Sequence, residues 1–405
     1  MIKQLKELLN FYKEIESNTL NVIKAQFFLQ LVASSFFLIL NIYLANNNFS
    51  DGEIANLISY RFLAVMVLAF PLGFFIRNRI LKPLFMIGSF GVPLVALLLV
   101  FLIKNSTTDY LYLIFVLWGI FYTFFQVGTL PYIMRNTNKS IQVYAISLSF
   151  STHSLATIFS GLCIFILGSL FSVEEGNILT LLSLIGFIGI YFVFQIRSDF
   201  DIISKKITTK SLKWSIILKA IIPTFIIAIG AGLTIPFINL FFYHNFSLDA
   251  PSFAFVGTLS SILVVVSSLY VPNIKKKYGA KKSIINTQLI AVIALILLAT
   301  TEFFNQYTFV LYFAIFFYLI RTPLMNMAAP LTSEFTMNYV GKHNQEMLSA
   351  ITSAIWSGSW YFSSQIFRLL IENNFKYYQI FYLTAGLYTL GIISYYVLII
   401  SSEKK

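Results

Sequence analysis

Long apolar runs alternate with short polar segments along the whole chain. Each run holds about 18 to 25 residues, which at the rise of an α-helix matches the hydrocarbon thickness of a bilayer. The pattern therefore predicts an all-α, polytopic membrane protein with twelve transmembrane helices. The predicted spans are 22–46, 54–76, 83–103, 109–134, 142–169, 177–196, 214–242, 251–272, 282–302, 307–335, 346–371 and 376–400.

Positive charge is confined almost entirely to alternate connections between these spans. One set of connections, together with the two ends of the chain, carries nearly all lysines and arginines, whereas the opposite set carries Lys104 and Lys376. Because short basic segments resist translocation, the basic set is expected to lie in the cytoplasm. Both termini are then cytoplasmic, which requires an even number of spans. We expect a multi-pass protein of the bacterial cytoplasmic (inner) membrane.

The two halves of the chain resemble each other at an offset of about 200 residues. Residues 40–50 and 238–247 each end in Asn-Phe-Ser, with an acidic residue following, and Pro131 corresponds to Pro330. This repeat predicts two pseudo-symmetric six-helix bundles with a site between them near the bilayer midplane. The expected parts are a cytoplasmic amphipathic N-terminal segment at 1–21, bundles at 22–196 and 214–400, a cytoplasmic linker at 197–213 and a cytoplasmic tail at 401–405.

Composition excludes several classes of protein. With 58% hydrophobic and 11% charged residues, the chain is too apolar for a soluble globule. The net charge of +12 gathers on one membrane side, which favours contact with anionic lipid headgroups on the cytoplasmic side over nucleic acid. The single cysteine and three histidines offer neither a metal cluster nor a nucleophile and base for catalysis. We expect a monomer that is not an enzyme and binds no cofactor or metal.

Two stretches of sequence carry a family resemblance. Residues 321–334 are similar to the tenth span of bacterial transporters, and the connection after span two keeps Gly73 and Lys82 of a loop signature while lacking its Asp. The second copy keeps Lys277 and Gly279, again without the Asp. The chain thus resembles the major facilitator superfamily over nearly all of its length. This resemblance implies a secondary transporter that works by alternating access, and it does not indicate a substrate.

Ionisable side chains at membrane depth are costly, so each is expected to face a cavity or a partner. Arg321 lies deep in the tenth span, beside Pro323. We expect its planar N–H donors to anchor an anionic or carbonyl-bearing substrate; the alternative is a structural arginine bonded to carbonyls of a neighbouring helix. Arg61, in the second span, either lines the same cavity or reaches outward towards Glu53.

Uncharged polar and aromatic residues complete the predicted site. Besides the two arginines, the predicted substrate-binding residues are Asn326, Gln126, Gln30, Trp356 and Trp360. The matched pair Asn41 and Asn239 suits a gate or a helix–helix hydrogen bond as well as a substrate contact. His153, midway along span five, titrates near neutral pH and is the candidate for proton coupling, with a packing role as the alternative.

The family resemblance also implies a cytoplasmic gate, in which the carboxylate of Glu334 pairs with cations of the basic loops. The expected gate residues are Glu334, Lys275, Lys276, Lys277, Arg77 and Arg79. Arg368 and Glu372, four residues apart near the end of span eleven, are expected to form an ordinary helical ion pair.

Two intramembrane arginines without a carboxylate in the middle of any span favour a negatively charged ligand over a cationic drug. The sequence therefore predicts a secondary transporter of a small organic solute that is anionic or amphipathic. The alternative is a multidrug or lipid-like efflux pump that recognises its substrates mainly through aromatic contacts.

Overall fold

The computed structural model describes residues 14–76, 79–138, 141–197, 213–341 and 344–403, and within these ranges the chain is helical without strands. The elements of the first half, called the N-terminal helices, are α2 (Ser17–Asn46), α3 (Asp51–Phe75), α4 (Lys82–Lys104), α5 (Leu111–Asn136), α6 (Gln142–Phe165), η1 (Ile166–Leu170), α7 (Glu175–Gly186) and α8 (Ile188–Phe194). Those of the second half, the C-terminal helices, are α9 (Trp214–Thr234), η3 (Ile235–Phe237), α10 (Ile238–Phe246), α11 (Ala250–Thr300), η4 (Thr301–Phe304), α12 (Val310–Val340), α13 (Gln345–Glu372) and α14 (Tyr377–Glu403).

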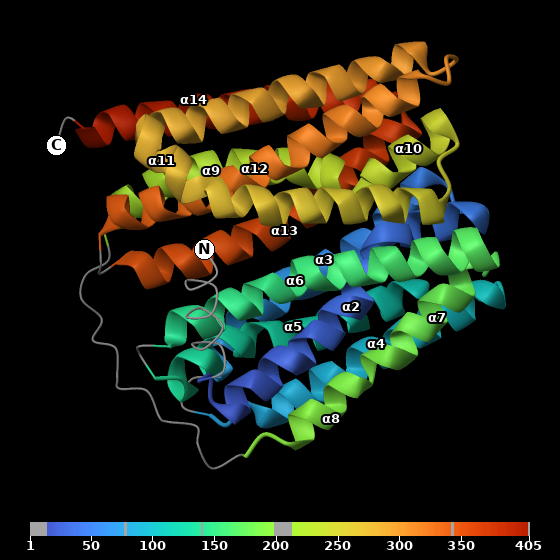
Figure 1. The fold of residues 1–405 in the computed structure, drawn as a ribbon, viewed down its shortest axis with the longest axis horizontal. Helices are drawn as coiled ribbons and strands as arrows, with labels where there is room; N and C mark the ends of the chain where they lie inside the picture. The colour runs from blue at the N-terminus through green and yellow to red at the C-terminus, as the bar shows by residue number, and fades with distance from the viewer. Residues whose placement is uncertain (1–13, 77–78, 139–140, 198–212, 342–343, 404–405) are drawn as a thin grey trace, which may run out of the picture.

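Several predicted spans are built from more than one element. The seventh combines α9, the 3-10 turn η3 and α10, because Pro236 in η3 cannot supply the N–H that a continuous α-helix needs. The eighth and ninth are the two arms of α11, which Figure 1 shows joined at one end and spread apart towards the other. The chain reverses between them at Gly279, whose φ of +76° is a conformation that suits glycine.

The ends of the elements differ from the predicted bounds in places. Helix α2 begins at Ser17, so residues 17–21 belong to the first span and not to a separate N-terminal segment. Residues 1–13 of that segment, and 198–212 of the predicted linker, lie outside the described residues.

Among the described residues, eleven helices are long and apolar enough to cross a membrane. The predicted eleventh span, α13, is long enough at 28 residues but is not among them. Its stretch from Ser349 to Gln365 is rich in serine and threonine, which lowers its hydropathy. A polar helix of this kind is expected to lie against protein more than lipid, and α13 packs along α3 and α9.

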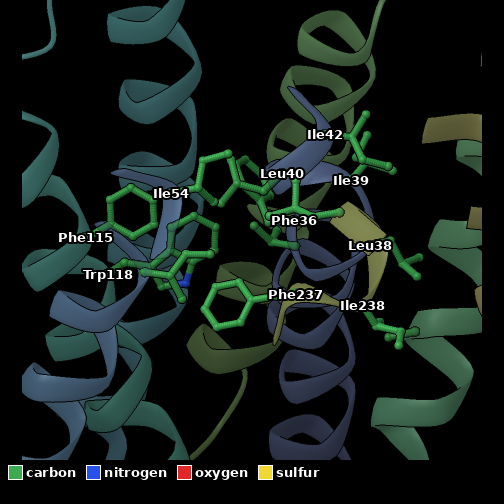
Figure 2. Close-up of a cluster of buried hydrophobic side chains, with 14 of the residues drawn as sticks. Phe36, Leu38, Ile39, Leu40, Ile42, Ile54, Phe115, Trp118, Phe237 and Ile238 are labelled. Atoms are coloured by element: carbon green, nitrogen blue, oxygen red, sulfur yellow. The ribbon is translucent and has the colours of Figure 1, made fainter. Parts of the chain in front are cut away.

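The two sets of helices lie beside each other, with the N-terminal helices in blue to green and the C-terminal helices in yellow to red (Figure 1). They meet where α3 packs on α13 and where α6 packs on α11, and α2 touches α10 and α11. Figure 2 shows that the hydrophobic core continues across this junction, since Phe36 of α2, Trp118 of α5 and Phe237 of η3 belong to one buried cluster.

One end of the molecule, here called the outer end, carries the connections 47–50, 105–110, 171–174, 247–249, 305–309 and 373–376. Contacts between the N-terminal and C-terminal helices are plentiful in its half of the structure. Gly161 of α6 leaves room for Thr258 of α11, and Gly168 in η1 leaves room for Pro251. Small residues thus let the two sets approach closely and close the outer end.

Candidate functional site

A mid-helix arginine of α3 lies in an aromatic cradle. The guanidinium carbon of Arg61 is 5.0 Å from the ring centre of Trp118 and 5.3 Å from that of Tyr122, both on α5. Gly119 of α5 makes this possible, because a Cβ there would overlap the carbonyl oxygen of Arg61. The side chain stays partly exposed. The structure shows no hydrogen bond or ion pair from this guanidinium to any described residue.

The alternative that Arg61 reaches outward is not what the structure shows. Glu53 accepts hydrogen bonds from the backbone and the hydroxyl of Ser50 at 2.8 and 2.7 Å, so its carboxylate is engaged at the start of α3. The Arg61 charge is instead held by ring faces, which attract cations most strongly where water is excluded.

A chain of polar groups continues from Tyr122 to two further helices. Gln30, buried in α2, donates from Nε2 to the Tyr122 hydroxyl at 3.2 Å. Its Oε1 lies 3.4 Å from Nδ1 of His153 on α6. His153 is exposed and Gln30 is not, so the contact connects a surface imidazole with a buried amide. The structure therefore joins three sequence-predicted residues, Arg61, Gln30 and His153, through Tyr122.

Tyr122 was missed by the sequence reasoning. Tyrosine is common in this chain, and nothing in its spacing separates Tyr122 from the many others. Gln126, one turn further along α5, is exposed.

The C-terminal helices contribute aromatic side chains next to Arg61. Trp360 of α13 packs edge-on against Phe62, the neighbour of Arg61, with ring centres 5.1 Å apart. The indole N–H groups of Trp360 and Trp118 are both buried without an acceptor among the described residues. Trp356, one turn before Trp360, is 37% exposed. The residues Arg61, Phe62, Trp118, Tyr122, Gln30, His153 and Trp360 are called the Arg61 cluster below.

Arg321 lies elsewhere. Its side chain is only 3% exposed, and Nη2 donates to the hydroxyl of Tyr388 on α14 at 3.0 Å. Its Nε has no partner among the described residues. The expected position beside a solvent-reachable cavity is therefore wrong for this conformation, because Arg321 is buried among the C-terminal helices. Asn326 is exposed and donates to the carbonyl of Thr322 on its own helix at 2.9 Å. A substrate role for either residue stays a prediction.

The matched asparagines join the two sets of helices. Asn41 of α2 donates from Nδ2 to Oδ1 of Asn239 on α10 at 2.9 Å and to the carbonyl of Pro236 at 2.6 Å. Asn239 in turn donates to the carbonyl of Leu38 at 3.2 Å. Both side chains are buried, so in this conformation they form a helix–helix bond.

A second layer of polar contacts lies above the asparagines at the outer end. Asp51 of α3 accepts from Nε2 of His244 on α10 at 2.9 Å and from the hydroxyl of Tyr377 on α14. Tyr243 donates to Oδ1 of Asn46 at 2.6 Å. These five residues are called the outer seal. They hold the N-terminal and C-terminal helices together on the side opposite the basic connections.

At the basic end the structure pairs Lys275 of α11 with Glu334 of α12, with Nζ 2.6 and 2.7 Å from the two carboxylate oxygens. This contact lies within the C-terminal helices. Lys276 and Lys277 are exposed, and Nζ of Lys277 lies 5.1 Å from the ring centre of Tyr278.

In the N-terminal helices, Arg135 donates to the carbonyls of Arg79 and Ile76, both at 3.1 Å, and the Arg79 guanidinium lies over Phe75. Arg77 lies outside the described residues. The predicted Arg368–Glu372 pair is confirmed at 2.7 Å.

Three further observations complete the description of the candidate site. The described residues contain no group of three or more His, Cys, Asp or Glu side chains that could hold a metal ion. The apolar helices would place the Arg61 cluster near the middle of a membrane. A cavity of about 300 Å³ at the outer ends of α11 and α12 is lined by apolar and aromatic residues together with Thr300 and Thr301, and it shares no residue with the cluster. Fold and site together are those of a polytopic membrane protein with polar groups buried at mid-depth, as transporters have.

The sequence profile of the Major Facilitator Superfamily matches residues 23–364. The chain belongs to this family and is a transporter of its type. No curated protein sequence matches the chain.

Solved transporters share the fold at low sequence identity. A mutant of the nucleoside transporter NupG aligns with a TM-score of 0.74 at 15% identity, covering 94% of this chain and 99% of that one. A bacterial homologue of the iron transporter ferroportin aligns in its inward-facing state with a TM-score of 0.71 at 12% identity, covering 94% and 98%. Its outward-facing state aligns with a TM-score of 0.63 at 11% identity, covering 94% and 99%.

Proposed function

We propose that this protein is a secondary transporter that moves a small organic anion across the bacterial inner membrane by alternating access. Its working parts are two six-helix bundles, 22–196 and 214–400, with α13 as the eleventh of twelve spans and both termini in the cytoplasm. The single observation that carries the proposal is the Arg61 guanidinium, which lies at mid-membrane depth without an anionic partner among the described residues. A cation in that position is stabilised when a negatively charged ligand binds beside it.

The conformation supports alternating access. The outer seal and the Asn41–Asn239 pair join the two sets of helices at the outer end, and the higher likeness to the inward-facing ferroportin homologue agrees with a closed outer side. We assign this structure to the inward-facing state. In the outward-facing state the outer contacts separate, and the region of Glu334 and the basic loops closes as the cytoplasmic gate.

Proton coupling belongs to the proposal through His153. The contact of Nδ1 with Gln30, and of Gln30 with Tyr122, connects the imidazole to the residue that cradles Arg61. Replacing His153 with Asn is expected to abolish the dependence of transport on a proton gradient. Transport that still follows the gradient in this variant would assign His153 a packing role.

Efflux of hydrophobic compounds is the second candidate, because the Arg61 cluster is largely aromatic. The two functions are separated by a thermal-shift screen of purified protein against organic anions, sugars, nucleosides and cationic dyes, since a bound ligand raises the apparent stability. We expect anions to stabilise the wild type and not an Arg61→Gln variant. Arg368→Gln is the matched control, because that exposed arginine is already paired with Glu372. Stabilisation by dyes alone, unchanged in Arg61→Gln, would support efflux and refute anion transport.

A further inference from the structure

The Arg61 cluster contains one formal positive charge and no negative one. Arg61 is its charged residue, and α2, α5 and α6 contain no Asp or Glu at all, while those of α3 lie at its outer end. A site at membrane depth is most stable when its net charge is close to zero. One negative charge therefore matches this site. A phosphate ester, with about −1.5 to −2 at neutral pH, would leave uncompensated charge behind.

The cluster is also rich in hydrogen-bond donors. The Tyr122 hydroxyl accepts from Gln30, which leaves its own proton free to donate to a ligand. The Arg61 guanidinium offers further N–H groups in one plane. The buried indole N–H groups of Trp118 and Trp360 also have no acceptor in the part of the chain that the structure describes. A ligand that supplies acceptors satisfies such a set, and a planar carboxylate matches the guanidinium with two parallel bonds.

The cluster contains no carboxylate that could form an ion pair with an ammonium. The carboxylates of α3, Asp51 and Glu53, are held at the outer end by His244 and by Ser50. An amino acid would have to bury its ammonium beside Arg61 without a counter-charge, which is unfavourable. The rings of Trp118, Tyr122, Phe62 and Trp360 favour a flat apolar body in its place.

We propose, resting on the proposed function, that the substrate is a singly charged organic carboxylate with an apolar, preferably aromatic body and no amino group. Arg61 and the Tyr122 hydroxyl bind its carboxylate. Gln30 is a positioning residue, because its hydrogen bond orients the Tyr122 hydroxyl so that the proton points away from α2.

The test uses a matched set of probes on the purified full-length protein. 3-Phenylpropionate is the expected ligand, 3-phenylpropionamide removes its charge, phenylalanine adds an ammonium, and benzylsuccinate adds a second carboxylate. Dissociation constants are measured by microscale thermophoresis in detergent at pH 7. We expect 3-phenylpropionate to bind at least about tenfold more tightly than each of the other three, since hydrogen bonds to charged groups are the stronger class.

Two variants assign the contacts. Tyr122→Phe keeps the ring beside Arg61 and is expected to weaken 3-phenylpropionate binding about tenfold while changing amide binding less than about twofold. Arg61→Gln is expected to remove the preference for the carboxylate over the amide, and Arg368→Gln is expected to retain it. Size-exclusion chromatography of each variant verifies folding. If Arg61→Gln does not fold, the result for Tyr122→Phe still decides the test.

The outcomes separate this inference from the proposed function. Tighter binding of benzylsuccinate or phenylalanine, lost in Arg61→Gln, would overturn the monocarboxylate class and leave anion transport standing. Equal binding of amide and carboxylate, unaffected by Arg61→Gln, would overturn both. No binding of 3-phenylpropionate to the wild type would overturn the inference, and the broader anion screen would then decide the proposed function.

Discussion

Replacing Asp51 with Asn is expected to open the outer end of the protein. Asp51 is the carboxylate of the outer seal, and both of its oxygens accept hydrogen bonds from the C-terminal helices, one from His244 and one from Tyr377. The Asp51 side chain is 13% exposed and that of His244 is 42% exposed. In the proposed transport cycle these contacts exist only while the outer end is closed, so they stabilise the proposed inward-facing state over the outward-facing one.

The size of the effect follows from the two bonds. A hydrogen bond to a charged group contributes about 1.5 to 3 kcal/mol. Asn keeps one acceptor oxygen and the half-exposed His244 is screened by water, so we expect a loss of about 2 kcal/mol rather than the full sum. Because about 1.4 kcal/mol is a tenfold change in an equilibrium constant, the ratio of outward-facing to inward-facing molecules should rise roughly 30-fold.

Pulsed electron paramagnetic resonance measures this ratio directly. The chain has one cysteine, Cys163, so in a Cys163→Ser background spin labels attach only to cysteines introduced at chosen sites. Thr108 and Gln306 lie in exposed outer connections of the N-terminal and C-terminal helices, respectively. We expect Asp51→Asn to move the distance distribution between these labels towards longer values.

Asp249 provides the control, because it occupies the corresponding place in the repeat. Its Oδ1 accepts from the backbone of Ser252 at 3.0 Å and caps its own helix α11. Asp249→Asn should therefore leave the distance distribution unchanged. An unaltered distribution in Asp51→Asn, or an equal shift in both variants, would refute the assignment of Asp51 to the outer seal.

Three more substitutions test the packing and the buried charges. Gly161→Ala should lower the melting temperature by an amount equivalent to about 1 to 3 kcal/mol, because the added Cβ would overlap α11. Gly386→Ala is the control, because the space at that position is open, and it should not lower the melting temperature. Equal melting temperatures of the two variants would contradict the close contact at Gly161. Glu334→Gln should cost less than about 1 kcal/mol of stability, because Glu334 and Lys275 are both partly exposed. The same variant should transport more slowly in proteoliposomes. An unchanged transport rate would show that Glu334 is not part of the gate. Arg321→Met should leave the melting temperature unchanged or raise it, because an apolar side chain replaces a buried charge whose hydrogen bonds are incomplete. A large decrease in the melting temperature would show that the charge stabilises the fold.

The helical spans were predictable because membrane burial leaves a simple hydropathy pattern, but α13 shows the limit of that pattern. A helix that packs on α3 and α9 does not need an apolar surface all round, so α13, although predicted as the span 346–371, is not among the helices that are apolar enough to cross a membrane. The reversal near Gly279 was predictable in position from the basic connection, whereas its sharpness was not, because a single glycine with positive φ suffices to turn the chain.

The two arginines show why the candidate site was only partly predictable. Sequence ranked Arg321 first from its depth and its neighbouring proline, yet depth does not say which way a side chain points around its helix. Arg321 faces Tyr388, inside the C-terminal helices, and Arg61 faces Tyr122. The position of Arg61 depends on Gly119, which lets α3 approach α5 closely. A close approach of this kind involves two helices and cannot be read from the sequence of one.

The Asn41–Asn239 bond has an implication for how such a chain arose. The two residues are counterparts in the predicted repeat, so each half of the protein meets the other through the same predicted position. Interfaces in which a residue faces its own equivalent are typical of two-fold symmetric homodimers. A gene duplication that fused two copies of a six-helix ancestor would preserve such a self-matching contact, and this amide pair would then be a surviving trace of the ancestral dimer.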